Sequence, residues 1–350
     1  MPISIDDILQ AAEDHGASDI FLQEGEIPRM KIHEQLMLFG DEKLMLPQMA
    51  GLWQACGADT LKDLDVDTGI TSRTGVRFRV NLHKVLGRLA GVLRRVRTDM
   101  PSLSALGAPE WLLTRWGLQE HGLVLVTGST GQGKSTTLAG LLHWMNENAA
   151  RHVVTIEDPV EFIFTNNRSM FTQREVGRDT PSFPRGLRAA MRQAPDVIFV
   201  GEIRDYDTAF TALQACETGH LVLASMHSAT VADTMERFVN LFPADQVGIG
   251  LHLLSHQLIG VLCQKLVPDA QGHLTLLVEH LQNGGAVRDW IARRQVGDIN
   301  EYMSRANDPN CRTFLQSIVS AYEQGIIDEA TAIASCGNEA EFRRAARGIS

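Results

Sequence analysis

The chain has 350 residues, a net charge of −10 at pH 7 and a hydrophobic fraction of 44%. This length is enough for two or three domains with cores of their own, and the acidic balance argues against nucleic acid as a partner of the whole surface. Five scattered cysteines without a C-x-x-C pair indicate a reducing compartment, with neither a zinc site nor a disulfide framework. The acidic N-terminus is unlike a secretory signal, and no apolar run approaches the roughly 20 residues of a membrane span, so we expect a cytoplasmic protein.

Residues 1–97 are predicted to form a small α+β domain. A helix is expected over residues 5–15 and another near residues 47–56. Strands are expected in the segments SDIFLQEG, PRMKIH and GVRFRVNLH. The polar segment 98–109, punctuated by proline and glycine, has the composition of a linker between domains.

Residues 110–267 are predicted to form an α/β domain. Four short runs rich in β-branched residues are each followed by a loop and a helical stretch: LVLVTG, HVVTIED, DVIFVGE and HLVLASMH. This alternation is typical of a parallel sheet. Residues 268–350 are predicted to be mostly helical, with two short helices interrupted at Gly325 in TFLQSIVSAYEQGIIDEATAIAS.

The segment GSTGQGKST matches the phosphate-loop pattern G-x-x-x-x-G-K-[ST] between a predicted strand and a predicted helix. Such a loop turns backbone N–H groups toward phosphate oxygens and places them at the positive end of a helix. We therefore expect a nucleoside triphosphate site, with Lys134 at the β- and γ-phosphates and Ser135 at Mg²⁺. The residues of this loop are Gly128, Ser129, Thr130, Gly131, Gln132, Gly133, Lys134, Ser135 and Thr136.

Carboxylates follow two of the predicted parallel strands, where ligands of such sheets bind. Glu157, Asp158 and Glu161 follow one strand, and Glu202 follows another. One acid could accept a proton from water while the other serves Mg²⁺. Each could instead be a solvated loop acid or a helix cap, and Asp158 before Pro159 also fits a turn. Glu161 and Glu202 are the favoured pair.

His220 and His227 lie at opposite ends of the predicted strand in GHLVLASMHS, about 20 Å apart at about 3.3 Å per residue. His227, at the carboxyl end, is expected to face the γ-phosphate. His220 is expected to be structural or to lie at a subunit contact, and either ring could be an ordinary packed histidine.

Between residues 73 and 97 the chain has eight basic residues and no acid. In GVRFRVN, Arg77 and Arg79 are predicted to share one strand face, opposite Val76, Phe78 and Val80. Such a row could recognise phosphate, or could be a solvated face with structural ion pairs. The eight residues are Arg73, Arg77, Arg79, Lys84, Arg88, Arg94, Arg95 and Arg97.

In order and spacing, the segments VTGSTGQGKSTTLAGLL, TIEDPVEF, TQREVGRDT, RQAPDVIFVGEIRD and ETGHLVLASMH resemble the Walker A, Asp box, Walker B and His box of type II/IV secretion ATPases. The resemblance is strongest to the type IV pilus retraction ATPases of the PilT/PilU family and leans toward PilU. It covers essentially the whole chain. It implies a RecA-like P-loop NTPase core, a PAS-like N-terminal domain and a C-terminal helical region.

The resemblance also implies roles by position. Glu161 matches a general base for the attacking water, and Glu202 matches an acid that serves Mg²⁺ through water, with Gly201 leaving room for that water. Arg79 and Arg94 match arginines that approach the nucleotide. Asp158 and His220 are included among the nucleotide-binding residues, and His227 among the catalytic ones.

A hexameric ring on the cytoplasmic side of a bacterial inner membrane is implied, under a platform protein of the PilC type. A second retraction ATPase is a further candidate partner, and ATP and Mg²⁺ are the expected substrate and cofactor. The segment AVRDWIARR departs from the family's AIRNLIRE, which bears on the coupling of hydrolysis to retraction. Three alternatives stay open: an assembly or secretion ATPase, an accessory ATP-binding ring subunit, and a small-molecule kinase.

Overall fold

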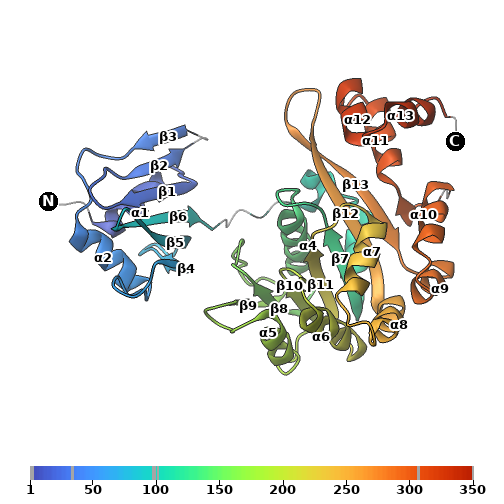
Figure 1. Ribbon diagram of the computed structural model, residues 1–350, viewed down its shortest axis with the longest axis horizontal. Coiled ribbons are helices and arrows are strands. Elements are labelled where there is room, and N and C mark those ends of the chain that lie inside the picture. Colours follow the sequence, from blue (N-terminus) through green and yellow to red (C-terminus); the bar gives the residue numbers. More distant parts are fainter. Residues whose placement is uncertain (1–3, 33–34, 97–99, 101, 306–307, 349–350) are drawn as a thin grey trace. The chain divides into compact units, whose positions relative to one another are not determined.

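The structure is a computed structural model that describes residues 4–32, 35–96, 100, 102–305 and 308–348. Arg97 of the arginine stretch and the start of the predicted linker lie outside these residues. The chain divides into two compact units, which are described separately below (Figure 1). Unit 1 comprises residues 1–98 and 161–163, and unit 2 comprises residues 99–160 and 164–350.

Unit 1 contains one antiparallel sheet with the strand order β3-β2-β1-β6-β5-β4. The predicted helices and strands are present, and β3, β4 and β6 were not predicted as strands. In chain order the elements are α1 (Ile5–Asp14), β1 (Asp19–Gln23), β2 (Arg29–Ile32), β3 (Gln35–Leu38), α2 (Leu46–Ala55), β4 (Asp65–Thr71), β5 (Arg77–Val85) and β6 (Arg88–Arg95).

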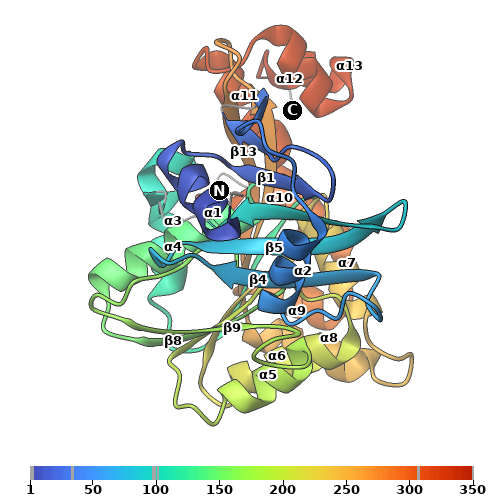
Figure 2. The same ribbon diagram turned by 90° about the vertical axis from the view of Figure 1, so that its left-hand side faces the viewer.

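The core of unit 1 lies between this sheet and its two helices. Phe78, Val80 and Leu82 alternate along β5 and are fully buried in one cluster with side chains of α1 and α2. Both helices cover the same face of the sheet (Figure 2). The predicted alternation of GVRFRVN is therefore confirmed, and Arg79 is exposed on the opposite face.

Unit 2 contains an eight-stranded sheet with the order β14-β13-β12-β7-β11-β10-β8-β9. The strands from β12 to β9 run parallel, whereas β13 and β14 are antiparallel to their neighbours. Up to β12 its elements are η1 (Leu103–Leu106), α3 (Glu110–Gly117), β7 (Gly122–Thr127), α4 (Lys134–Asn148), β8 (His152–Glu157), β9 (Met170–Glu175), α5 (Phe183–Ala190), β10 (Val197–Val200), α6 (Tyr206–Glu217), β11 (Leu221–Met226), α7 (Val231–Asn240), α8 (Val247–Gln257) and β12 (Leu258–Pro268).

The four strands predicted in this region are β7, β8, β10 and β11, and their parallel pairing is confirmed. Leu123 and Leu125 of β7 pack in one cluster with side chains of α5, α6, α7 and α8. Val124 and Val126 alternate with them and are also fully buried, so both faces of the sheet are covered. Such burial explains why the strands appear as continuous apolar runs.

The prediction of a mostly helical region after Pro268 missed two strands. The remaining elements are β13 (Leu274–Gln282), α9 (Ala286–Ala292), α10 (Val296–Arg305), β14 (Cys311–Arg312), α11 (Phe314–Glu323), α12 (Glu329–Cys336) and α13 (Glu339–Ala345). β13 pairs with β12 along its full length, so the predicted boundary at residue 267 falls inside a hairpin of the sheet. Glu279 and His280 interrupt the apolar run of β13 although both are buried, and this concealed the strand. The predicted helices on either side of Gly325 are α11 and α12.

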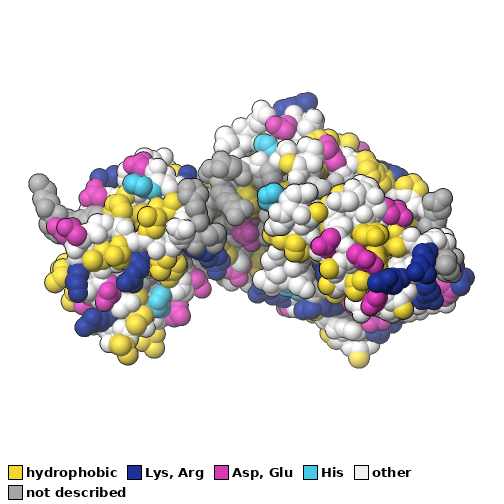
Figure 3. All heavy atoms as spheres, turned by 90° about the horizontal axis from the view of Figure 1, so that it is seen from above, with side chains coloured by type: hydrophobic (Ala, Val, Ile, Leu, Met, Phe, Trp, Pro, Cys, Tyr) yellow, Lys and Arg dark blue, Asp and Glu magenta, His cyan; other side chains and the backbone are white. Residues whose placement is uncertain are grey.

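On the face seen in Figure 3, side chains of both charges are interspersed with hydrophobic ones on each unit. Within the described part of the chain, no helix combines the length and apolar character that a membrane span requires.

Candidate nucleotide site

The predicted phosphate loop lies between β7 and α4, as the motif requires. The ammonium of Lys134 donates to the carbonyl oxygens of Gly128 and Ser129 at 2.9 and 3.0 Å. α4 begins at Lys134 after Gly133, whose φ of 82° is left-handed, and no side chain caps this end. An uncapped helix N-terminus directs its first N–H groups outward, and such N–H groups can bind phosphate.

The phosphate loop is held against β12. A Cβ atom on Gly128 would lie 2.7 Å from the carbonyl oxygen of Gln264, and Gly128 has a φ of 151°, so only glycine fits here. The side chain of Gln132 accepts a hydrogen bond from the N–H of Leu266 at 2.6 Å. Gln264 also donates to Thr137 of α4 at 2.8 Å. β12 thus positions both ends of the loop, a role that sequence patterns did not reveal.

Glu202 and His227 meet at the carboxyl ends of the adjacent parallel strands β10 and β11. His227 Nε2 lies 3.2 Å from Glu202 Oε1, and His227 Nδ1 lies 3.3 Å from the ammonium of Lys134. An ammonium can only donate, so Nδ1 accepts and Nε2 carries the proton that it donates to Glu202. His227 therefore links the phosphate-loop lysine to the carboxylate.

Arg204 completes this group, and the sequence motifs did not predict a role for it. Its guanidinium lies 2.7 Å from Glu202 Oε2. The hydrogen bond to Glu202 raises the pKa of Arg204, and the nearby charge of Asp158 adds to this. The signal in the sequence was a base two residues after the strand-end acid. Glu202 is thus held between His227 and Arg204, with only 15% of its side chain exposed.

The acids after β8 have different environments. Glu157 is buried and accepts a hydrogen bond from Thr155 at 2.6 Å, whereas Asp158 is exposed and acts on Arg204 through its charge. Glu161 is exposed and belongs to the segment 161–163 that is grouped with unit 1. Its role as a base stays a prediction.

The backbone is closely packed around Gly201 on the side where a Cβ atom would lie, and the expectation that Gly201 leaves room for a metal-bound water stays a prediction. A Cβ atom at Gly201 would come within 3.3 Å of the backbone of Ile156 and Glu157. The N–H of Gly201 donates to Ile156 at 2.8 Å, and its carbonyl accepts from Ser225. Glycine suits this position because the backbones of β8 and β10 approach closely here.

His220 is not part of the group around Lys134. It precedes β11 at the amino end of the strand, and its Nδ1 lies 3.0 Å from the carbonyl oxygen of Ala215 and 3.1 Å from Thr218 Oγ1. Since His227 follows the other end of the same extended strand, the two rings cannot share one phosphate. Among the described residues, no hydrogen bond joins His220 to the group around Lys134, and its contacts with Ala215 and Thr218 fit the structural reading. A nucleotide-binding role for His220 stays a prediction.

Arg79 and Arg94 are directly opposite each other on β5 and β6 of unit 1. Arg94 also faces Asp19 of β1, and its Nε lies 2.6 Å from the nearly buried Asp19 carboxylate. The structural reading of Arg94 as one half of an ion pair is therefore supported. Arg79 is exposed beside it, and none of the carboxylates in the described residues forms an ion pair with it.

The family model described as "Type II/IV secretion system protein" matches residues 64–322. The "Type IV pilus ATPase PilU" of Pseudomonas aeruginosa is 34% identical over 342 residues, covering 96% of this chain and 89% of the relative. The "Type IV pilus retractation ATPase PilT" of the same organism is 32% identical over 335 residues, covering 94% of this chain and 97% of the relative.

Solved structures agree with this assignment. The crystal structure of the pilus retraction motor PilT with bound ADP has a TM-score of 0.88 and 35% identity, covering 98% of this chain and 99% of that one. The ATPase DotB of Legionella pneumophila has a TM-score of 0.86 and 29% identity, covering 96% and 97%. These matches support a RecA-like ATPase core and nucleotide binding. The chain belongs to the type II/IV secretion system protein family, among the pilus ATPases that resemble PilT and PilU.

Proposed function

We propose that the chain is an ATP-hydrolysing motor that powers retraction of a type IV pilus. The observation that carries this proposal is the contact series from Lys134 through His227 to Glu202. It joins the phosphate-loop cation to a strand-end carboxylate beside the uncapped start of α4. This is the arrangement that phosphoryl transfer requires, because that reaction depends on positioned charge more than on covalent chemistry.

Mg²⁺ is the expected cofactor, and the donor set fits it. The Ser135 hydroxyl at the first turn of α4 and the Glu202 carboxylate are oxygen donors of the kind that Mg²⁺ prefers, and Mg²⁺ commonly needs few protein ligands beside phosphate and water. When bound, it would neutralise charge on the phosphates. Lys134 would exchange its contacts with loop carbonyls for phosphate oxygens.

The remaining roles extend the same proposal. Glu161 accepts the proton of the attacking water, and Glu202 would help to hold Mg²⁺ through water when the metal is bound. His227 couples the presence or absence of the γ-phosphate to the position of Glu202 through the hydrogen bond that it donates to this carboxylate. Arg79 and Arg94 supply positive charge toward the nucleotide, with Arg94 positioned by Asp19.

We further propose a homohexamer that acts at the cytoplasmic face of the inner membrane beneath a PilC-type platform protein. The resemblance to secretion and pilus ATPases supports oligomerisation in general. Unit 1 corresponds to the PAS-like domain of this reading. The helices after β13 form its C-terminal region, and segment 98–109 its linker. Nucleic acid is not among the proposed partners.

An accessory ring subunit that assists a second retraction ATPase is the alternative favoured by α9. In this helix Trp290 lies 5.7 Å from Tyr302 of α10, centroid to centroid, and packs against the core of unit 2. Trp290, which departs from the family pattern, therefore takes part in the packing of α9 against α10. A change at this place would affect the coupling of hydrolysis to retraction and not the phosphate loop.

The test is ATP turnover by the purified chain. Glu161→Gln and Glu202→Gln are each expected to lower kcat by about 10²-fold or more while nucleotide binding persists. Glu217→Gln, at an exposed acid near the end of α6, is the matched control. Unchanged turnover in both site variants would refute the assigned roles. Retraction in a cell that has no other retraction ATPase separates the motor from the accessory subunit, because only the motor supports it.

A further inference from the structure

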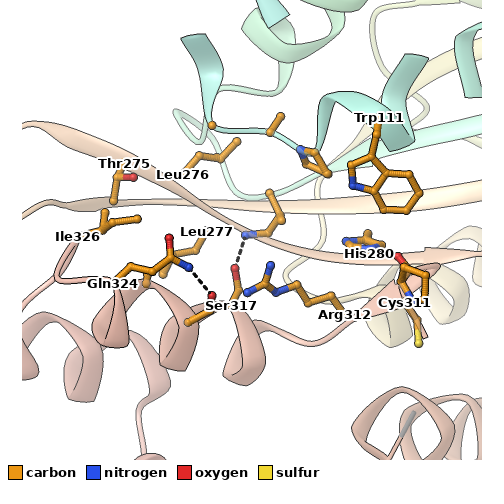
Figure 4. Close-up of a pocket in the computed structure, with 17 residues that line it drawn as sticks. Trp111, Thr275, Leu276, Leu277, His280, Cys311, Arg312, Ser317, Gln324 and Ile326 are labelled. Carbon is orange, nitrogen blue, oxygen red and sulfur yellow. Dashed lines mark hydrogen bonds between the residues drawn. The ribbon is translucent and has the colours of Figure 1, made fainter. Parts of the chain in front are cut away.

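A second pocket of about 490 Å³ lies in unit 2 and has no part in the nucleotide site. It is a partly open pocket that is lined by residues of the segment 107–111, β13, β14 and α11 (Figure 4). This volume lies in the range of small-molecule sites. Leu276, Leu277 and Ile326 give it an apolar end, while Trp111 and His280 line the other end, with their rings edge to face at 6.4 Å.

Arg312 provides a fixed positive charge in this pocket. Figure 4 shows its side chain reaching from β14 along the pocket toward Ser317. The guanidinium donates to the carbonyl oxygen of Gln316 at 3.3 Å, and no carboxylate of the described residues pairs with it. Desolvation lowers the pKa of Arg312, in keeping with the lack of an ion pair to it among the described residues.

The neighbouring acids are engaged elsewhere. Asp308 accepts hydrogen bonds from Tyr302 and from the backbone and side chain of Asn310. Glu279 accepts from the N–H groups of Val231 and Phe314. None of the described residues that line the pocket is acidic. A half-buried guanidinium without a counterion favours an anion from outside the chain.

The other polar groups narrow the chemistry of that anion. His280 is buried, and burial lowers its pKa, so among the described lining residues the fixed positive charge belongs to Arg312. That charge matches a monoanion better than a phosphate dianion. The hydroxyls of Ser317 and Ser320 each accept one hydrogen bond, from Val278 N–H and from Gln324, and both keep a hydrogen to donate.

We propose that this pocket binds an organic carboxylate that carries an apolar or aromatic group. The guanidinium fork of Arg312 receives the carboxylate, a serine hydroxyl donates to it, and the apolar group lies along Leu276 and Leu277 or against Trp111. A bound acid would contact both the segment 107–111 and α11. It would therefore stabilise the packing of the start of unit 2 against its C-terminal helices. The acid could be a free small molecule or the acidic side chain of a peptide.

The test compares acids with their uncharged amides on the full-length chain without nucleotide, by isothermal titration calorimetry. Indole-3-acetate is paired with indole-3-acetamide, and acetyl-Leu-Glu-Leu-amide with its glutamine counterpart. At least one acid is expected to bind about ten-fold or more tightly than its amide, because a charge-assisted bidentate pair is lost in the amide. The acid that binds more tightly distinguishes a small molecule from a peptide.

Arg312→Gln is expected to remove the preference for the acid, whereas Arg293→Gln, at an exposed arginine after α9, should leave it intact. Binding that is equal for acid and amide in both pairs, or no binding of either acid, would overturn the proposal. This comparison needs only the unmodified chain, so it stands even if Arg312→Gln fails to fold. It is also independent of ATP turnover.

Discussion

His227 Nε2 lies 3.2 Å from Glu202 Oε1 where the parallel strands β11 and β10 end side by side. The other nitrogen of the same ring is 3.3 Å from the ammonium of Lys134. If phosphate binding moves Lys134, the change would therefore reach Glu202 through the side chain of His227.

The two histidines that flank β11 offer a matched comparison. His227→Gln is expected to lower kcat by about 10²-fold, because it alters the link between Lys134 and Glu202. His220→Gln is expected to leave kcat unchanged and to reduce the free energy of unfolding by about 1 kcal/mol, since it disturbs contacts with Ala215 and Thr218. Steady-state ATPase assays and urea unfolding measure both. An equal loss of kcat in the two variants would show that His220 acts at a neighbouring subunit's nucleotide.

Arg79 and Arg94 of unit 1 differ in their expected contribution to stability. Arg79→Ala is expected to lower turnover, because it removes positive charge that we propose acts on the nucleotide. It should cost little stability, because Arg79 is a like charge directly opposite Arg94. Arg94→Ala is expected to reduce the free energy of unfolding by about 1 kcal/mol, since Asp19 loses its partner. Thermal unfolding monitored by circular dichroism tests the stability difference. Equal destabilisation by both variants would contradict this assignment.

Glu279 of β13 makes stability depend on pH. Its carboxylate accepts from Val231 N–H at the start of α7 and from Phe314 N–H at the start of α11. Burial outweighs these bonds and raises the pKa of Glu279 above its ordinary value of 4.5. A raised folded-state pKa gives stability that is full below the ordinary pKa and is lost as the pH rises through the folded-state pKa. Replacing the titratable carboxyl group of Glu279 by an amide should remove this pH dependence.

Urea unfolding at a series of pH values from 4 upward is the measurement. The free energy of unfolding of the parent is expected to fall relative to that of Glu279→Gln as the pH rises above 4.5. Glu323→Gln, at an exposed acid in α11, serves as the control and should run parallel to the parent. A constant difference between the parent and Glu279→Gln at all pH values would contradict the linkage.

Two glycines give opposite expectations for the same substitution. A Cβ atom on Gly260 of β12 would lie 2.2 Å from the ring of Trp116, so Gly260→Ala is expected to destabilise unit 2 by about 1–3 kcal/mol. Gly248 in α8 has open space around it, so Gly248→Ala is expected to stabilise by about 0.5–1 kcal/mol. Thermal melts of the two variants check both signs. A stable Gly260→Ala protein would show that Trp116 can move.

Local patterns were sufficient for much of the core. The phosphate loop, the four central strands and the inward alternation of Phe78 and Val80 each depend on a few consecutive residues, and all were predicted. β13 was missed because Glu279 and His280 are buried in it, where apolar residues were expected. Their backbone partners, Val231 and Pro309, lie elsewhere in the chain and leave no local signal.

The sequence by itself determined where the phosphate-loop motif lies, which segments form the parallel sheet, and that His220 and His227 lie at opposite ends of one strand. Only the tertiary structure decided that Lys134 contacts His227, 93 residues away, and that Arg94 pairs with Asp19 across 75 residues. It also decided that Arg312 lines a pocket without a carboxylate. Periodicity is a property of neighbouring residues, whereas these contacts depend on which strands pair and in what register, and that is set by the packing of the whole sheet.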